Sequence, residues 1–185
     1  WRNLATSDTV LETSKMTTPP VLATVSDRPV GAYPSGPKAV VTKYLDGNTW
    51  KSVSTASIAA ADSIVSLKLK VGGSNLYPAV LTSAGSLSVY KSANGTSTWA
   101  SVGDAIEGAS VIALDCHPTS GNPLVSFIDA TTKTPKYSRW SGSAWVTDDV
   151  AGPAYRTFTT TNCRRVNHKD VCDTTYTNHP VKVRE

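Results

Sequence analysis

The sequence predicts an all-β fold, and three observations carry that prediction. Serine, threonine and valine are abundant, and 12 glycines and 11 prolines are spread along the chain as turn formers. No window of 11 residues repeats its apolar positions at the helical period. Residues 64–70 instead alternate apolar and polar side chains, as a half-buried strand does. We therefore expect many short strands joined by turns.

Length and charge exclude several classes of protein. The 185 residues suit one domain with a sizeable core. No apolar run approaches the roughly 20 residues of a membrane span, and no signal-peptide pattern opens the sequence. Because the chain begins at Trp1, we expect a processed product or an excerpt of a longer protein. The net charge of +4 comes partly from the last 33 residues, and basic residues elsewhere are scattered singly, so we expect a solvated basic rim and no nucleic-acid partner.

A repeat of roughly 47 residues organises the sequence. Three tryptophans that each follow a small-residue turn lie 49 and 46 residues apart, namely Trp50, Trp99 and Trp145. Three prolines that each open a β-like run precede these tryptophans by 21, 21 and 22 residues, namely Pro29, Pro78 and Pro123. Two landmarks that keep the same offset three times indicate a structural repeat.

Each repeat is predicted to form four short strands, most clearly in residues 58–102. The expected strands there are 64–70, 77–82, 86–91 and 98–102. A proline is tolerated at the start of the second strand, where its missing N–H leaves no gap in the middle of a ladder. Four strands in about 47 residues is the size of a β-propeller blade, and we expect the tryptophan to pack between neighbouring blades.

The two ends of the chain are expected to complete a ring of blades. Residues 1–4 are similar to the fourth strands that begin at Trp50 and Trp99, and they are predicted to close the last blade, which removes two free sheet edges. The last unit itself supplies three strand-like runs, at 155–162, 171–177 and 180–184. The predicted fold is one β-propeller domain over residues 1–185 with four blades, at 9–53, 58–102, 106–150, and 153–185 together with 1–7. The alternative is a fragment of a larger propeller.

Residues 92–99, Ser-Ala-Asn-Gly-Thr-Ser-Thr-Trp, resemble the Asp-box (BNR) hairpin of sialidase-like propellers, with Asn94 at the aspartate position. Residues 46–50 resemble a shortened copy, and the third copy keeps only Gly142 and Trp145. The tryptophan-bearing repeats also resemble those of propeller lectins. In the Asp-box family this hairpin is a structural turn remote from the active site, so the resemblance implies a fold rather than an activity.

An enzymatic function is not expected. The sialidase relatives would require an arginine triad, a tyrosine paired with a glutamate, and an aspartic acid. Glu12 and Glu107 are the only glutamates before the last residue of this chain. The histidines have no metal-ligand spacing such as His-x-x-x-His, since they stand at His117, His168 and His179. We expect no catalytic residue, no metal and no cofactor.

The cysteines and one sequon favour an extracellular location. Cys163 and Cys172 flank the polar turn 164–169, so a cross-hairpin disulfide is sterically reasonable. Cys116 is left open as a buried free thiol, a link to another chain, or the true partner of one of the other two. Asn94 begins an Asn-Gly-Thr glycosylation sequon on a predicted hairpin tip.

Binding is the expected function, because propeller repeats can present one pocket several times. The candidate ligand residues are the aromatic side chain before each turn and its basic neighbour, namely Tyr44 with Lys43, Tyr90 with Lys91, and Trp140 with Arg139. Aromatic faces of this kind stack on the C–H surfaces of sugars. The competing interpretation is that these aromatic residues, and still more the three repeat tryptophans, form the packing between blades.

Two functions remain open at this point. The first is a lectin-like module that recognises glycans through repeated weak sites. The second is a structural or adhesive module of an extracellular coat, fibre or cell-surface glycoprotein assembly, with other extracellular proteins or copies of itself as partners. Only the basic neighbour of the aromatic residue recurs among the polar residues of the three units, so the repeat does not decide between them.

Overall fold

A computed structural model of the chain describes residues 18–54, 57–95, 98–150, 155–166 and 169–180, with side chains described as far as residue 150. Every helix or strand element in these residues is a β-strand, which confirms the all-β prediction. The chain forms two compact units, Trp1–Val150 and Ala151–Glu185.

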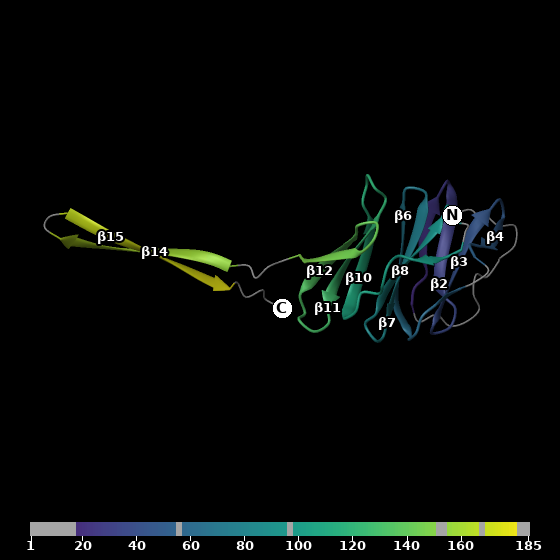
Figure 1. Cartoon of the computed structure of the whole chain (residues 1–185), viewed down its shortest axis with the longest axis horizontal. Helices are drawn as coiled ribbons and strands as arrows, with labels where there is room; N and C mark the ends of the chain where they lie inside the picture. Colours follow the sequence, from purple (N-terminus) through teal and green to yellow (C-terminus); the bar gives the residue numbers. More distant parts are fainter. Residues whose placement is uncertain (1–17, 55–56, 96–97, 151–154, 167–168, 181–185) are drawn as a thin grey trace. The chain divides into compact units, whose positions relative to one another are not determined.

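Three antiparallel sheets follow one another in the first unit, each made of four consecutive strands (Figure 1). The first sheet holds β1 (Val21–Val25), β2 (Arg28–Pro34), β3 (Ala39–Asp46) and β4 (Thr49–Ser52), and the short β5 (Ile58–Ala59) also pairs with β3. The second sheet holds β6 (Ile64–Gly72), β7 (Asn75–Thr82), β8 (Leu87–Ala93) and β9 (Ala100–Ser101). The third sheet holds β10 (Ala109–Cys116), β11 (Pro123–Asp129), β12 (Pro135–Trp140) and β13 (Trp145–Asp149). Each of the first three predicted units therefore contributes four consecutive strands to one sheet, and β5, from the start of the second unit, adds a fifth strand to the first sheet.

The fourth repeat differs from the prediction. Its described residues form a hairpin of two 12-residue strands, β14 (Tyr155–Val166) and β15 (Lys169–Pro180), rather than several short strands. The segment contains no glycine, and its only proline is the last residue of β15, so nothing interrupts the threonine-rich ladder. Residues 1–7, which were expected to supply the closing strand, and residues 181–184 lie outside the described part of the chain.

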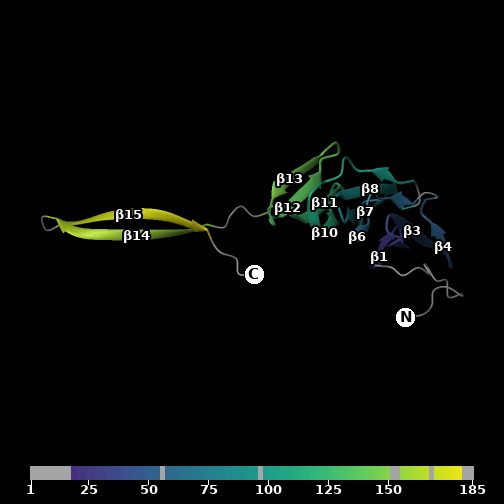
Figure 2. The same ribbon diagram turned by 90° about the horizontal axis from the view of Figure 1, so that it is seen from below.

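The second sheet is covered on both faces. All residues of β7 except Asn75 are buried. On one side, Val80 shares a hydrophobic core with Val30 of the first sheet, and on the other side Leu81 shares a second core with Val125 of the third. Figures 1 and 2 show the three sheets side by side in both views. Because burial of one large aliphatic side chain is worth about 1.5–3 kcal/mol, these two cores hold the first unit together.

The sheets stack by the same pair of faces each time. We call "front" the face that carries the residue after the landmark proline and "back" the face that carries the next residue, since successive side chains alternate along a strand. The front residues are Val30, Ala79 and Leu124, and the back residues are Gly31, Val80 and Val125. Val30 and Val80 belong to the first core, whereas Ala79 and Val125 belong to the second. The front of each sheet therefore packs on the back of the next.

The landmark prolines lie at different depths in their strands. Pro123 is the first residue of β11 and Pro29 the second residue of β2, close to the expectation, but Pro78 is the fourth residue of β7. The β7–β8 ladder has no partners for Tyr77 and Pro78 and resumes in the same register at Ala79. The missing N–H of Pro78 thus causes one local gap, and its fully buried ring packs in the core.

Two glycines allow the second and third sheets to approach closely. A Cβ atom on Gly72, at the end of β6, would lie 2.1 Å from the carbonyl oxygen of Gly121 and 2.9 Å from Cys116 Sγ. Because the nearest atom belongs to the backbone, no side-chain rotation could relieve this clash. The contact between β6 and the turn before β11 therefore requires glycine.

Replacing Gly72 by alanine is expected to destabilise the first unit by about 1–3 kcal/mol, the usual cost of overpacking a close contact. Gly31→Ala is the matched control, since neither glycine has a positive φ and the nearest atom to a Cβ on Gly31 is the flexible end of Leu22, at 3.3 Å. Urea unfolding of both variants measures the difference. Equal stability of the two variants would contradict the close backbone contact.

Candidate functional site

The three aromatic candidates do not occupy equivalent positions. Tyr44 stands opposite Val30 in the β2–β3 ladder and so lies on the front face of the first sheet. Tyr90 and Trp140 lie on the back faces of the second and third sheets, because Ser88 pairs with Val80 and Ser138 pairs with Val125. The sequence alignment of the three residues therefore does not correspond to three copies of one pocket.

Tyr44 and Tyr90 serve the packing between the first two sheets. Both are half-buried and contact the first core, one from each sheet. The guanidinium of Arg28 lies 5.8 Å from the centre of the Tyr44 ring, in cation–π distance. Beside it, Lys51 donates to Asp46 at 2.5 Å, and this hydrogen bond lowers the pKa of Asp46. Tyr44 is thus engaged by the first core and by the guanidinium of Arg28.

The basic candidates lie on the opposite faces from their aromatic neighbours, because adjacent residues in a strand alternate in direction. Lys43 pairs with Gly31 and so lies on the back face of the first sheet, and Arg139 pairs with Leu124 on the front face of the third. Lys91 and Arg139 are exposed, and Lys43 is half-buried. No single ligand can therefore contact both members of one such pair from one side of a sheet.

Trp140 instead belongs to a pocket with a second tryptophan. The rings of Trp140 and Trp145 meet edge to face, with centroids 5.5 Å apart and planes at 62°. They line an open cavity of about 540 Å³ between the third sheet and the segment after β9. Its remaining lining is supplied by small and polar residues and one isoleucine, namely Gly103, Asp104, Ala105, Ile106, Ser143, Ala144 and Thr147.

Local structure fixes both walls of this pocket. Trp140 and Trp145 are register partners at the end of the β12–β13 hairpin, whose turn is closed by Ser141: its Oγ accepts the N–H of Ala144 at 3.0 Å. Trp145 Nε1 donates to the carbonyl oxygen of Val102 at 2.8 Å. Gly103 has a φ of 67°, and a Cβ there would lie 2.5 Å from the Trp140 ring, so glycine lets this segment approach the indole.

Most residues of this pocket were not predicted from the sequence. Trp145 was expected in the packing between sheets, and it does contact the second core, but it also lines the cavity. Gly103 and Asp104 carried only a weak signal, since they follow the predicted strand that ends near Val102. Gly103 lies against the Trp140 ring and Asp104 lines the same cavity, so two successive repeats meet here. A periodic pattern does not specify which loops of neighbouring repeats meet.

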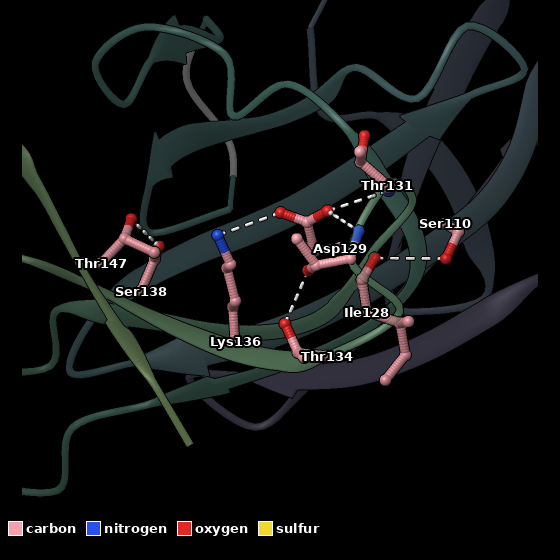
Figure 3. Close-up of polar contacts among 9 residues, drawn as sticks. Ser110, Ile128, Asp129, Thr131, Thr134, Lys136, Ser138 and Thr147 are labelled. Carbon is pink, nitrogen blue, oxygen red and sulfur yellow. Dashed lines mark hydrogen bonds and ion pairs between the residues drawn. The ribbon is translucent and has the colours of Figure 1, made fainter. Parts of the chain in front are cut away.

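Asp129 holds the turn between β11 and β12 (Figure 3). Its Oδ1 accepts the backbone N–H groups of Thr131 and Thr132, both at 2.9 Å, and its Oδ2 lies 3.0 Å from Lys136 Nζ. The hydrogen bond from the Thr132 N–H is the largest cause that holds the pKa of Asp129 well below its usual range, and the Lys136 ammonium adds to it. The carboxylate therefore has a structural role as a turn-forming group.

Metal-ligand chemistry finds no support among the described side chains, where no group of three His, Cys, Asp or Glu residues could hold an ion. His117 Nδ1 instead accepts the N–H groups of Thr119 and Ser120, each at 3.3 Å, in the turn before β11. His168 lies outside the described residues, and the side chain of His179 on β15 is not among those described.

The structure gives the backbone positions of the three cysteines and of Asn94 in the sequon. Cys163 and Cys172 are direct register partners on β14 and β15, although their side chains lie beyond the described ones. Cys116 has no disulfide partner among the described side chains, and its burial, with Asp115 nearby, raises the pKa of its thiol to about 11. Asn94 is exposed in the turn after β8 with a φ of 54°, while Thr96 of the same sequon is outside the described residues.

No protein-family model matches the chain, and a search of curated proteins finds no significant relative. The Asp-box resemblance therefore rests on the residues of this sequence alone. In the part of the chain that the structure describes, no helix is long and apolar enough to cross a membrane.

Asp129→Asn is expected to lower the melting temperature near neutral pH and to matter less in acid. The pKa of Asp129 is lowered in the folded state, so its carboxylate stabilises the fold above the unfolded pKa of about 3.9 and loses that contribution as pH falls below it. The difference in melting temperature between the parent and the variant should shrink progressively as pH falls from about 5 to about 3, without vanishing there, because the folded-state pKa lies lower still. Asp62→Asn, which removes an exposed carboxylate elsewhere, is the control. A constant gap between parent and Asp129→Asn would contradict this account.

A disulfide between Cys163 and Cys172 is expected in protein made under oxidising conditions, because the two residues face each other across one hairpin. Peptide mapping without reduction should recover the two cysteine peptides as one linked species. Cys116 should react with an alkylating reagent mainly after unfolding, since burial disfavours its thiolate. A linked peptide that contains Cys116 would contradict this pairing.

Proposed function

We propose that this protein is a non-enzymatic extracellular binding module that recognises glycans, and that the pocket of Trp140 and Trp145 is the binding site. The observation that carries the proposal is the pair of indole rings in an open cavity of about 540 Å³ with carboxylate and hydroxyl groups at its edge. Pockets that are largely apolar with a few convergent polar groups are the usual form of small-ligand sites.

The chemistry of this pocket matches that of a sugar. A pyranose ring presents C–H groups on its faces and hydroxyl groups around its edge, so it needs an aromatic wall and nearby hydrogen-bonding groups. Trp140 and Trp145 supply the wall. Asp104, Ser143 and Thr147 supply acceptors and donors from the two sides of the cavity, and all three residues are exposed.

In this proposal the three sheets are successive blades of a propeller. The support is that the front of each sheet packs on the back of the next, so each repeat contacts its neighbours in the same way. The proposed extracellular location is supported by the exposed Asn94 and by the facing positions of Cys163 and Cys172. Closure of a fourth blade by residues 1–7 stays a prediction.

A structural or adhesive role is the second candidate, and the apolar side chains on the outermost sheet faces favour it. Leu22 of the first sheet and Val111 of the third are among the most exposed large hydrophobic residues described. Contiguous exposed apolar patches are typical of surfaces that contact another protein, and Val111 and Ile128 line one shallow cavity on the third sheet.

Binding of the intact protein to a broad glycan array tests the first candidate. Trp140→Ala is expected to weaken binding by at least about tenfold, corresponding to about 1.4 kcal/mol, because it removes half of the aromatic wall. Asp104→Asn, which keeps the shape, should also weaken binding. Tyr90→Ala is the control, since Tyr90 packs in the first core away from the pocket.

Each variant must first show the cooperative unfolding of the parent protein. If the folded parent binds no glycan, the lectin-like proposal is wrong and the structural role becomes the leading candidate. If Tyr90→Ala abolishes binding while Trp140→Ala does not, glycan recognition would stand but the proposed pocket would be wrong.

A further inference from the structure

The two outermost faces of the first unit have no sheet packed against them among the described residues. These are the back of the first sheet and the front of the third sheet, at the two ends of the stack. Each carries a highly exposed aliphatic side chain: Leu22 is 72% exposed and Val111 is 63% exposed. The front faces of the first and second sheets and the back faces of the second and third sheets are each covered by a neighbouring sheet.

Leu22 has two counterparts that show what its position does in this fold. It pairs with Gly31, two residues after the landmark proline, just as Leu67 pairs with Val80 and Leu114 pairs with Val125. All three positions are leucine. Leu67 and Leu114 are only 2% and 7% exposed, because each packs on the front of the preceding sheet. Leu22 thus has the side chain for the same contact but no sheet against it.

The repeat tryptophans follow the same rule. Trp99 packs against the first core and Trp145 against the second, each from the back of its sheet. Trp50 pairs with Leu45. Leu45 lies on the same face of β3 as Lys43, two residues earlier, and Lys43 pairs with Gly31, so Trp50 also lies on the back of the first sheet. The back of the first sheet therefore presents the same leucine and tryptophan that dock the second and third sheets.

The front of the third sheet is the uncovered face at the other end of the stack. Leu124 corresponds to Val30 and Ala79, both buried against the back of the next sheet. Around it, the face is hollowed by two shallow cavities of about 160 and 320 Å³, with Val111, Ile128 and Tyr137 among their lining residues.

We infer that two copies of this chain associate head to tail, with the back of the first sheet of one copy against the front of the third sheet of the other. The contact would continue the stacking that the first unit already uses twice. Among the described elements, the back of the first sheet is the only face of the kind that packs on a front face with no sheet against it, although Tyr33 on that face is only 3% exposed. The hairpin β14–β15 has two strands and is not a four-stranded sheet of this repeat. A contact between two different faces closes into a ring or extends into a chain of copies.

Sedimentation of the full chain over a range of concentrations tests the association. The parent is expected to form larger species as concentration rises. Leu22→Asp and Val111→Asp should each prevent this, since each buries a charge in one half of the interface. Val65→Asp is the matched control: Val65 is 51% exposed but belongs to the second sheet, whose two faces are already covered.

Mixing the two variants tests the head-to-tail geometry. Leu22→Asp keeps an intact third-sheet face and Val111→Asp keeps an intact first-sheet face, so an equimolar mixture is expected to form one-to-one dimers and nothing larger. If each face paired with its own kind instead, each variant alone would already form dimers through its intact face, and the head-to-tail inference would be wrong.

A parent protein that remains monomeric at every concentration would overturn the inference and would favour closure of the ring within one chain. The glycan array separates this result from the proposed binding function. Neither Leu22 nor Val111 lines the tryptophan pocket, so both variants should keep any glycan binding that the parent shows.

Discussion

Burial of β7 between two neighbouring sheets is the interaction on which the rest of the first unit depends. A strand with both faces apolar is stable only when a sheet covers each face, and β7 receives one from each side. Leu76 and Leu81 face opposite cores and are almost completely buried. The second sheet therefore fixes the positions of the first and third sheets, and the glycines at Gly72 and Gly121 set how closely the third approaches.

The tryptophan pocket is a consequence of this stacking. Its two walls come from successive repeats, and they meet because the third sheet packs on the second. The hydrogen bond from Trp145 to Val102 and the close approach of Gly103 to Trp140 hold the walls together. The same aromatic residues thus stabilise the contact between sheets and expose part of their surface to a cavity, which reconciles the two interpretations of the repeated aromatics at this one place.

The repeat also explains why the outer faces resemble interior ones. Leucine and tryptophan recur at equivalent positions of all three sheets, although only two of these positions are covered within the first unit. A side chain that is selected for packing in a repeat retains its chemistry at the end of the stack, where terminal repeats commonly need a cap or a partner. The exposure of Leu22 follows from its place at the end and not from a different local sequence.

Local sequence determined the strands, the period and the landmark tryptophans, because alternation of side chains and turn residues depends on neighbours along the chain. Tertiary structure decided which face each aromatic residue occupies, since one residue of register moves a side chain to the other side of a sheet. For this reason Tyr44 and Trp140, aligned in the sequence, lie on different kinds of face. The close approach of Gly103 to Trp140 was likewise undetermined by the sequence pattern, because a contact between segments of successive repeats arises only when their sheets pack.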